Sequence, residues 1–266
     1  MISAAAPAKI NLALVVGPTR PDGFHEVATL LQRVDLADTV TLEAAAELTV
    51  EGFEEDTLVR DALVAIAEAV GIEPRWRARI EKRIPVGAGL GGGSSDAATA
   101  LRLACELLDR PPSSGRLHEI AAGLGVDVAF FLADGPQLGT GTGTTLAPVD
   151  LPHDYAVLLL LPDGVQKPST AEIYGRFTGA SGFDERRARV LEAAAAGRRA
   201  DLAALPPNDL AASPLSTRLL ELGAFRADVS GAGPTVYGLF ARREDAERAA
   251  AAVEGLGASW LTTPEC

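Results

Sequence analysis

A glycine-rich segment at residues 84–98 constrains this chain more than any other part of its sequence. It reads Ile-Pro-Val-Gly-Ala-Gly-Leu-Gly-Gly-Gly-Ser-Ser-Asp-Ala-Ala, and apolar residues follow it at helical spacing. Glycine lets the backbone approach an anion closely, and a helix N-terminus supplies unpaired N–H groups with partial positive charge. The segment therefore predicts a loop, a helix that begins at Asp96 with Ser94, Ser95 and Asp96 as capping residues, and a phosphate site at the junction.

Several interpretations of this glycine pattern compete. A P-loop requires a lysine directly after the glycines, and none follows here. The dinucleotide spacing is present at Gly87, Gly89 and Gly92, but Pro85 disfavours the central strand that should precede it. The acidic residue at the matching distance, Asp109, lies in a helix-stop sequence. A glycine-rich turn before an ordinary helix is the structural alternative.

The bulk properties narrow the class of protein. With 266 residues and 47% hydrophobic content, the chain can build a proper core, in one large domain or two modest ones. A net charge of −12 opposes non-specific binding of nucleic acid. Cys105 and Cys266 give no disulfide framework and no metal pattern, and three histidines are too few for a histidine metal cage. The sequence has no apolar run of membrane-spanning length and no secretion signal, so we expect a cytoplasmic protein.

Strand and helix signals alternate along the whole chain, which predicts a mixed α and β protein. Residues 75–80 alternate charged and apolar side chains and predict an amphipathic strand, whereas residues 155–161 predict a buried one. Residues 228–240 predict two strands around a glycine turn. The sequence pattern changes near Pro148, so we expect two domains, at 1–149 and 150–266.

A few residues could carry chemistry. Lys9 is one of only three lysines, with Lys82 and Lys167, and it lies at a strand start, where it could also protect a sheet edge. Asp127 lies in an apolar context that requires a charge partner, a proton or a function. Phe24 and His25 share a turn, and each could equally be structural. A Ser–His–Asp nucleophile is excluded because no serine lies in a nucleophile elbow.

Several short sequence motifs of this chain, taken together, resemble those of a known family. The pattern Pro-x-x-x-Gly-Leu-Gly-x-x-Ser-Ser at 85–95 resembles the second motif of the galactokinase–homoserine kinase–mevalonate kinase–phosphomevalonate kinase superfamily. The blocks at 8–12 and 20–25 resemble the N-terminal signature of one of its families, the 4-diphosphocytidyl-2-C-methyl-D-erythritol kinases. Further blocks in family order lie at 125–128, 139–143, 207–210 and 230–235. Ala129 departs from the usual proline, and Phe24 from the usual tyrosine.

The resemblance implies an ATP- and Mg²⁺-dependent kinase of the non-mevalonate isoprenoid route, which phosphorylates the C2 hydroxyl of a cytidyl-diphosphate substrate. It implies catalytic roles for Lys9 and Asp127 and substrate contacts from Asn11, Phe24, His25 and Tyr174. The residues that it assigns to the ATP phosphates are Pro85, Gly87, Gly89, Leu90, Gly91, Gly92, Gly93, Ser94 and Ser95. No metal ligand is assigned, although the Ser95 hydroxyl is an option.

The fold implied by the resemblance is α+β with two domains and an active site in the cleft between them. Its N-terminal α/β domain has a left-handed βαβ unit, and its C-terminal domain is a ferredoxin-like sandwich. The expected partner is a small-molecule substrate, with no nucleic acid and no membrane, and the chain is expected to be a monomer or a homodimer. The competing functions are another kinase of the superfamily, a nucleotide sensor that does not turn ATP over, and a dinucleotide-dependent oxidoreductase.

Overall fold

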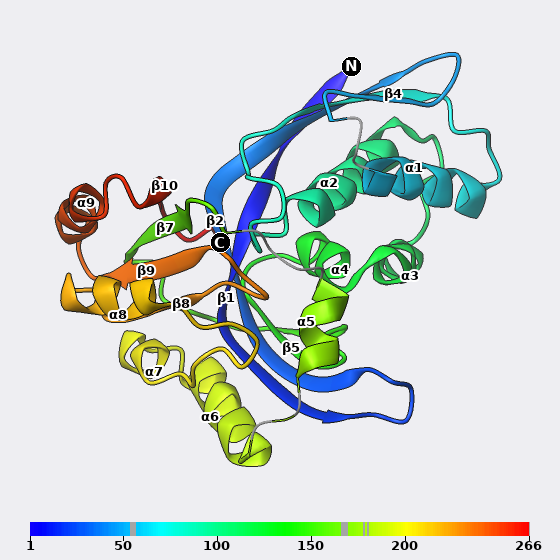
Figure 1. The fold of residues 1–266 in the computed structure, drawn as a ribbon. Helices are drawn as coiled ribbons and strands as arrows, with labels where there is room; N and C mark the ends of the chain where they lie inside the picture. The colour runs from blue at the N-terminus through cyan, green and yellow to red at the C-terminus, as the bar shows by residue number, and fades with distance from the viewer. Residues whose placement is uncertain (54–56, 166–169, 178, 180, 266) are drawn as a thin grey trace. The chain divides into compact units, whose positions relative to one another are not determined.

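The computed structural model describes residues 1–53, 57–165, 170–177, 179 and 181–265. Lys167 and Cys266, named above, lie outside these ranges. Within the described residues the strands form one six-stranded and one four-stranded sheet, and helices occur throughout the chain (Figure 1). The expected mixture of α and β structure is confirmed.

The chain divides into two compact units, and neither is a single stretch of sequence. The first unit comprises Met1–Ala8, Leu36–Val86 and Gly91–Asp134, and the second comprises Lys9–Asp35, Gly87–Leu90 and Gly135–Cys266. Two long strands, β1 (Ile2–Thr19) and β2 (His25–Ala44), contribute residues to both units. The expected domain boundary between residues 149 and 150 stays a prediction.

The first unit contains the strand predicted from charge alternation. In β4 (Trp76–Glu81), Trp76, Ala78 and Ile80 are buried while the residues between them are exposed, as a period of two requires. β4 pairs antiparallel with the end of β2 and parallel with β3 (Thr49–Glu51). Strand β3, helix α1 (Thr57–Val70) and β4 therefore form a β-α-β unit. The left-handed crossover expected for it stays a prediction.

Four helices complete the description of the first unit: α1, α2 (Gly92–Leu107), α3 (Ser114–Leu124) and α4 (Val126–Leu132). Helix α1 buries Val59, Leu63 and Ile66 along one face, which is the spacing of a helix packed on one side. Helices α1 and α4 each pack against α2 and α3. These contacts fix the direction in which the N-terminus of α2 points within this unit.

The second unit contains the four-stranded sheet, with the order β10-β7-β9-β8 and antiparallel pairing throughout. Its strands are β7 (Ala156–Pro162), β8 (Arg226–Val229), β9 (Val236–Phe240) and β10 (Gly257–Thr262). Helices α8 (Pro214–Glu221) and α9 (Arg243–Ala252) pack on it through a core of Leu158, Leu160, Leu219, Val236 and Phe240. The element sequence β7-α8-β8-β9-α9-β10 is that of a ferredoxin-like sandwich, as expected.

The remaining elements of the second unit include β5 (Gln137–Gly141), which pairs with residues 27–31 of β2, and β6 (Thr145–Pro148), which pairs with β5. Helices α5 (Thr170–Arg176), α6 (Phe183–Ala196) and α7 (Arg199–Ala203) connect β7 to α8 along the chain. The alanine- and arginine-rich stretch at 184–204 is therefore largely helical.

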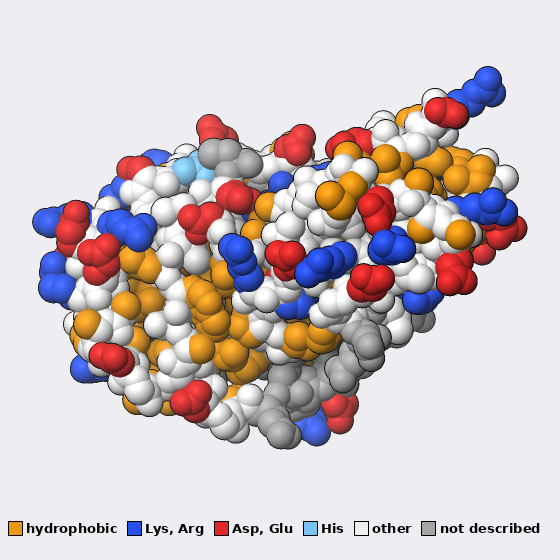
Figure 2. Space-filling view, turned by 90° about the horizontal axis from the view of Figure 1, so that it is seen from above, with side chains coloured by type: hydrophobic (Ala, Val, Ile, Leu, Met, Phe, Trp, Pro, Cys, Tyr) orange, Lys and Arg blue, Asp and Glu red, His pale blue; other side chains and the backbone are white. Residues whose placement is uncertain are grey.

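The surface carries charges of both signs. On the face seen in Figure 2, acidic and basic side chains are interspersed. Several of them form ion pairs within one helix, such as Arg189 with Glu185 and Arg243 with Glu247. Among the described residues, no helix combines the length and the apolar character that crossing a membrane requires.

Candidate active site

The glycine-rich loop ends in an uncapped helix N-terminus. Gly87, Gly89 and Gly91 all adopt positive φ angles, of 69°, 82° and 73°, which favour glycine. Gly91 is the N-cap of α2, and no side chain there accepts a hydrogen bond from the first turn. The amide nitrogens at the start of α2 therefore point away from the helix with partial positive charge, as an anion site requires.

The start of this helix differs from the prediction. The helix begins at Gly92, not at Asp96, because the left-handed Gly91 already turns the chain and its carbonyl accepts the N–H of Ser95 at 2.9 Å. Ser94, Ser95 and Asp96 consequently lie inside α2 and do not cap it. The Ser95 hydroxyl is fully buried and has no hydrogen-bond partner within the part of the chain that the structure describes.

A buried ion cluster joins three segments of the first unit beside this loop. The ammonium of Lys82 lies 2.6 Å from Oδ2 of Asp38 and 2.7 Å from Oδ2 of Asp96. Both carboxyl side chains have no exposed surface. Asp38 also accepts the backbone N–H groups of Arg83 and Ile84, the latter at 2.8 Å. The cluster therefore links β2, the chain leaving β4, and α2.

The charges of this cluster support one another. Burial disfavours the positive charge of Lys82, but the hydrogen bonds that its ammonium donates to Asp38 and Asp96, together with their negative charges, outweigh it, and the pKa of Lys82 lies above its ordinary value. Sequence reasoning counted Lys82 among the rare lysines but gave it no role. The available signal was Asp96 itself, a carboxylate directly before the mostly apolar run at 97–101, since such a group has to be paired when it is buried.

Asp127 lies in the first turn of α4, directly after its N-cap, Gly125. The side chain is half-buried, and a carboxylate in a helix's first turn is favoured by the helix dipole. Because α4 packs against α2, Asp127 and the N-terminus of α2 belong to the same unit. The ordinary alternative, a purely structural ion pair, and the catalytic role both stay predictions.

Lys9 lies in the second unit and is hydrogen-bonded to the glycine loop at Leu90. Its backbone N–H donates to the carbonyl of Leu90 at 2.9 Å, and its ammonium donates to Oδ1 of Asn11 at 2.7 Å. Lys9 and Asn11 are two residues apart on β1, so their side chains share one face. Both residues are buried, with 4% and 6% of their surface exposed. A buried ammonium fixed by an amide is a charged donor rather than protection for a sheet edge.

Asn11 is held in turn by two further groups. Its side-chain amide donates to the hydroxyl of Thr29 on β2 at 2.8 Å, and Thr29 donates to the carbonyl of Ala13. Its backbone N–H donates to the hydroxyl of Ser230 at 3.4 Å, and Ser230 donates to the carbonyl of Gly89 at 3.0 Å. The block at 230–235 and the glycine loop are thus hydrogen-bonded at the same place.

The turn before β2 presents an exposed ring. Phe24 is 64% exposed, and its N–H donates to Oδ1 of Asp22 at 3.1 Å. This backbone hydrogen bond, helped by Arg20, lowers the pKa of Asp22. The guanidinium of Arg20 contacts both Asp22 and Glu26. Phe24 is therefore not a core residue, because the turn holds it toward solvent.

The ring of His25 packs among aromatic side chains. It lies 5.9 Å from the ring of Tyr174, tilted, and 5.5 Å from Phe177, edge to face. Its Nδ1 lies 2.9 Å from the carbonyl of Gly17. The structure thus brings together His25 and Tyr174, both predicted, and adds Phe177, which sequence reasoning missed. The signal that could have indicated it was an aromatic residue three positions after Tyr174, directly after the last residue of α5.

The predicted site residues belong to two groups, one in each compact unit. Asp127 and the start of α2 belong to the first unit, whereas Lys9, Asn11, Phe24, His25 and Tyr174 belong to the second. The meeting of Asp127 with Lys9 stays a prediction. Across the described ranges, the structure holds no group of three or more histidine, cysteine, aspartate or glutamate side chains suited to a metal ion.

Comparison with known proteins defines the class. A family model described as "GHMP kinases N terminal domain" matches residues 57–135, and one described as "GHMP kinases C terminal" matches residues 215–258. The chain is similar to a solved mevalonate kinase at only 13% identity, with a TM-score of 0.75 over 99% of each chain, which supports the fold alone. The fold and the glycine loop are those of a GHMP kinase.

Relatives of higher identity narrow the class further. The 4-diphosphocytidyl-2-C-methyl-D-erythritol kinase of Salinibacter ruber (strain DSM 13855 / M31) is 36% identical, covering 94% of this chain and 93% of its own. The same kinase of Anaeromyxobacter sp. (strain Fw109-5) is 41% identical, covering 92% and 84%. A crystal structure of 4-(cytidine 5'-diphospho)-2C-methyl-D-erythritol kinase matches at 33% identity, with a TM-score of 0.82 over all of both chains. The chain belongs to the 4-diphosphocytidyl-2-C-methyl-D-erythritol kinase family.

Proposed function

We propose that the chain transfers the γ-phosphoryl group of ATP to the C2 hydroxyl of 4-(cytidine 5'-diphospho)-2-C-methyl-D-erythritol, in the non-mevalonate route to isoprenoid precursors. Family membership supports the reaction. The single observation that carries the site is the junction of Lys9 with the glycine loop. A buried ammonium, oriented by Asn11, is hydrogen-bonded through its own backbone to Leu90.

The glycine loop and the start of α2 would hold the ATP phosphates. No side chain caps the first turn of α2, and its N-cap residue, Gly91, has no Cβ to keep a phosphate away from the backbone. Phosphoryl transfer depends mostly on positioning and on stabilising charge, so a rigid set of amide donors is the contribution that this segment can make.

In the transfer step the C2 hydroxyl oxygen of the acceptor bonds to the γ-phosphorus as the bond from that phosphorus to the β,γ-bridging oxygen breaks, and ADP leaves. Asp127 would accept the hydroxyl proton or orient the hydroxyl. Lys9 would be the charge partner of Asp127 and would neutralise charge on the transferred group. These two roles require the two side chains to converge when substrates are bound.

A magnesium ion, when bound, would offset negative charge on the ATP phosphates. In proteins this ion is often held by substrate phosphates, water and only one or two protein groups, so a dedicated carboxylate cluster is not required. The buried Ser95 hydroxyl, which has no partner within the described residues, fits as one such group.

The turn at 20–25 would recognise the cytosine ring. Phe24 offers an exposed face for stacking, although it lacks the hydroxyl of a tyrosine. His25 and Tyr174 lie ring to ring, so Tyr174 is the second aromatic available for a stack around the base. Asn11 would contact the erythritol or phosphate end.

The deciding experiment is ADP release coupled to a spectrophotometric readout. The purified chain is given ATP, Mg²⁺ and either the cytidyl-diphosphate alcohol, homoserine or mevalonate. We expect turnover with the cytidyl substrate alone. Turnover with homoserine or mevalonate instead would assign another kinase of the superfamily, and ATP binding without any turnover would indicate a nucleotide sensor.

A further inference from the structure

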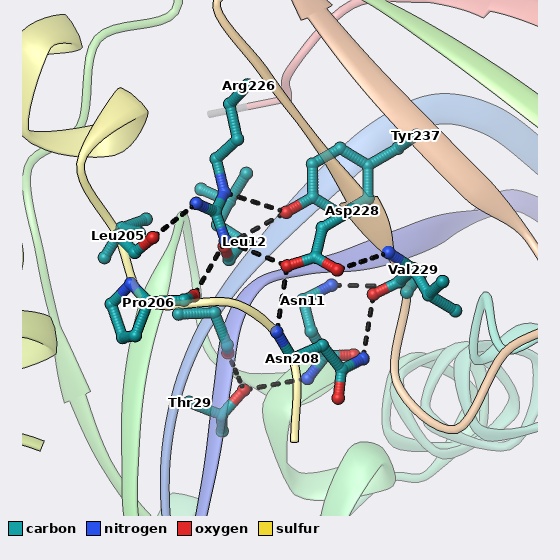
Figure 3. Close-up of polar contacts among 12 residues, drawn as sticks. Asn11, Leu12, Thr29, Leu205, Pro206, Asn208, Arg226, Asp228, Val229 and Tyr237 are labelled. Atoms are coloured by element: carbon teal, nitrogen blue, oxygen red, sulfur yellow. Dashed lines mark hydrogen bonds and ion pairs between the residues drawn. The ribbon is translucent and has the colours of Figure 1, made fainter. Parts of the chain in front are cut away.

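A buried arginine organises polar contacts on β8 and β9 in the second unit (Figure 3). Arg226 is 5% exposed, and its Nε donates to the hydroxyl of Tyr237 at 3.1 Å. Its two terminal nitrogens donate to the carbonyl of Leu205 at 2.7 Å and to that of Pro206 at 3.0 Å. One of them also lies 3.2 Å from Oδ2 of Asp228. Each nitrogen of the guanidinium is thus engaged.

The strand register explains why these side chains meet. Arg226 and Asp228 are two residues apart on β8, so they share a face of the strand. Tyr237 on β9 is the direct cross-strand partner of Asp228. Arginine, aspartate and tyrosine are therefore brought together by the pairing of the two strands, before any loop contributes.

One arm of this network reaches β1. The hydroxyl of Tyr237, which accepts from Arg226, donates to the carbonyl of Leu12 at 3.0 Å. Leu12 directly follows Asn11, whose amide oxygen holds the ammonium of Lys9. Tyr237 is fully buried, so this hydrogen bond is shielded from water.

The second arm reaches the glycine turn after β8. Asp228 accepts the N–H of Asn208 at 2.9 Å, and the Asn208 side chain donates to the carbonyls of Val229 and Gly231 at 2.9 and 2.6 Å. The hydroxyl of Ser230, within that turn, accepts the N–H of Asn11. Both arms therefore end at Asn11 or at its direct neighbours.

The turn lies against the Lys9–Asn11 pair with little space between them. A methyl group added at Gly231 would lie 3.2 Å from Oδ1 of Asn11 and 3.5 Å from the ammonium of Lys9. The turn therefore bounds the space that the Lys9–Asn11 pair occupies, and a side chain at position 231 would force Asn11 to move by a few tenths of an ångström. The buried ion pair between Arg226 and Asp228 adds little net stability compared with apolar residues of equal size, so its contribution to geometry is what needs explaining.

We infer that Arg226 is a positioning residue for the Lys9–Asn11 pair, and that it acts through Tyr237 on β1 and through Asp228 and Asn208 on the 229–231 turn. The activity readout of this inference rests on the proposed function. Arg226 itself contacts neither substrate nor reacting atoms in this account. Through these contacts Arg226 fixes the position of the Lys9 ammonium.

The test compares two tyrosine-to-phenylalanine variants. Tyr237→Phe removes the hydroxyl that links Arg226 to Leu12, whereas the control, Tyr155→Phe, removes a buried hydroxyl that has no hydrogen-bond partner within the described residues. We expect Tyr237→Phe to lower kcat about tenfold while the KM for ATP stays unchanged, because a small displacement of an oriented group slows transfer. Tyr155→Phe should match the unsubstituted chain in both.

A second readout does not depend on activity. We expect the amide hydrogen of Asn11, which donates to Ser230, to exchange with deuterium faster in Tyr237→Phe than in Tyr155→Phe. A variant Arg226→Lys, which keeps the charge beside Asp228 but not the forked donors, should reproduce both effects. Unchanged kcat and unchanged Asn11 exchange in a folded Tyr237→Phe would overturn the inference. Absence of ADP release in the unsubstituted chain would refute the proposed function. The exchange rate of the Asn11 amide would then still decide whether Arg226 positions the Lys9–Asn11 pair.

Discussion

Replacing Lys82 by methionine removes the cation between two carboxylates whose side chains have no exposed surface. Breaking a buried ion pair by removing one partner costs about 3 to 5 kcal/mol, because a buried charge is left uncompensated. Asp38 retains the two backbone N–H donors of Arg83 and Ile84, so we expect a loss of about 3 kcal/mol, at the lower end of this range. Stabilities of about 5 to 15 kcal/mol are usual, so the variant should still fold.

The measurement is urea unfolding of Lys82→Met against Arg79→Met, a control on β4, the strand that directly precedes Lys82, where the side chain is 65% exposed. The control should change the free energy of unfolding by less than about 0.5 kcal/mol. The double variant Lys82→Met/Asp96→Asn should recover part of the loss, since it removes the uncompensated charge. A Lys82→Met variant as stable as its control would refute the reasoning.

The pH dependence has a defined sign. The folded-state pKa of Lys82 is raised above its ordinary 10.5, so the stabilisation is fully present below pH 10.5 and is lost as the pH rises through the folded-state pKa. The difference between the unsubstituted chain and Lys82→Met should therefore stay constant between about pH 7 and 9 and shrink only at higher pH. If the stability difference between the two proteins changed between pH 7 and pH 9, groups other than Lys82 would be responsible for it.

Three further predictions concern the site. Asp127→Asn should lower kcat by about 10²–10⁴-fold with unchanged urea unfolding, and near-normal turnover would remove Asp127 from its role. Phe24→Ala should raise the KM for the cytidyl substrate about tenfold while the KM for ATP, measured in the same assay, stays constant. An equal change in both constants would contradict stacking on cytosine. Gly89→Ala should destabilise the chain by at least about 1 to 3 kcal/mol in urea unfolding, because φ is +82° and the added methyl would lie 2.6 Å from the carbonyl oxygen of Ser230. A variant as stable as the unsubstituted chain would show that the 230–234 turn can move aside.

Local patterns predicted the regular elements well where one periodicity dominates. The alternation at 75–80 became β4, the apolar run at 155–161 became β7, and the glycine turn within 228–240 separates β8 from β9. Each of these strands is short, and the order of apolar and polar residues within it directly predicts which of them are buried. The start of α2 was missed because serine and aspartate favour caps, whereas a left-handed glycine had already begun the helix.

Residues that act over long sequence distances were harder to predict. Lys82 binds Asp38 across a sequence separation of 44 residues, and Tyr237 binds Leu12 across one of 225 residues. Only the fold brings these partners together. Lys9, Asn11 and Asp127 were indicated by local motifs and a family resemblance. Arg226 had no such signal, because an arginine in a strand usually points toward solvent.

The discontinuous units have a consequence for dissecting this protein. A cut between residues 149 and 150 would separate Lys9–Asp35, Gly87–Leu90 and residues 135–149 from the remainder of the second unit. A fragment from 150 onward would retain the strands of the ferredoxin-like sheet, yet the phenol of Tyr237 would lose the Leu12 carbonyl that completes its bonding. Independent expression of the two halves would therefore leave the Tyr237 hydroxyl with its donor, Arg226, but without its acceptor. A permuted or tethered chain that keeps the first strand with the later sheet avoids that defect.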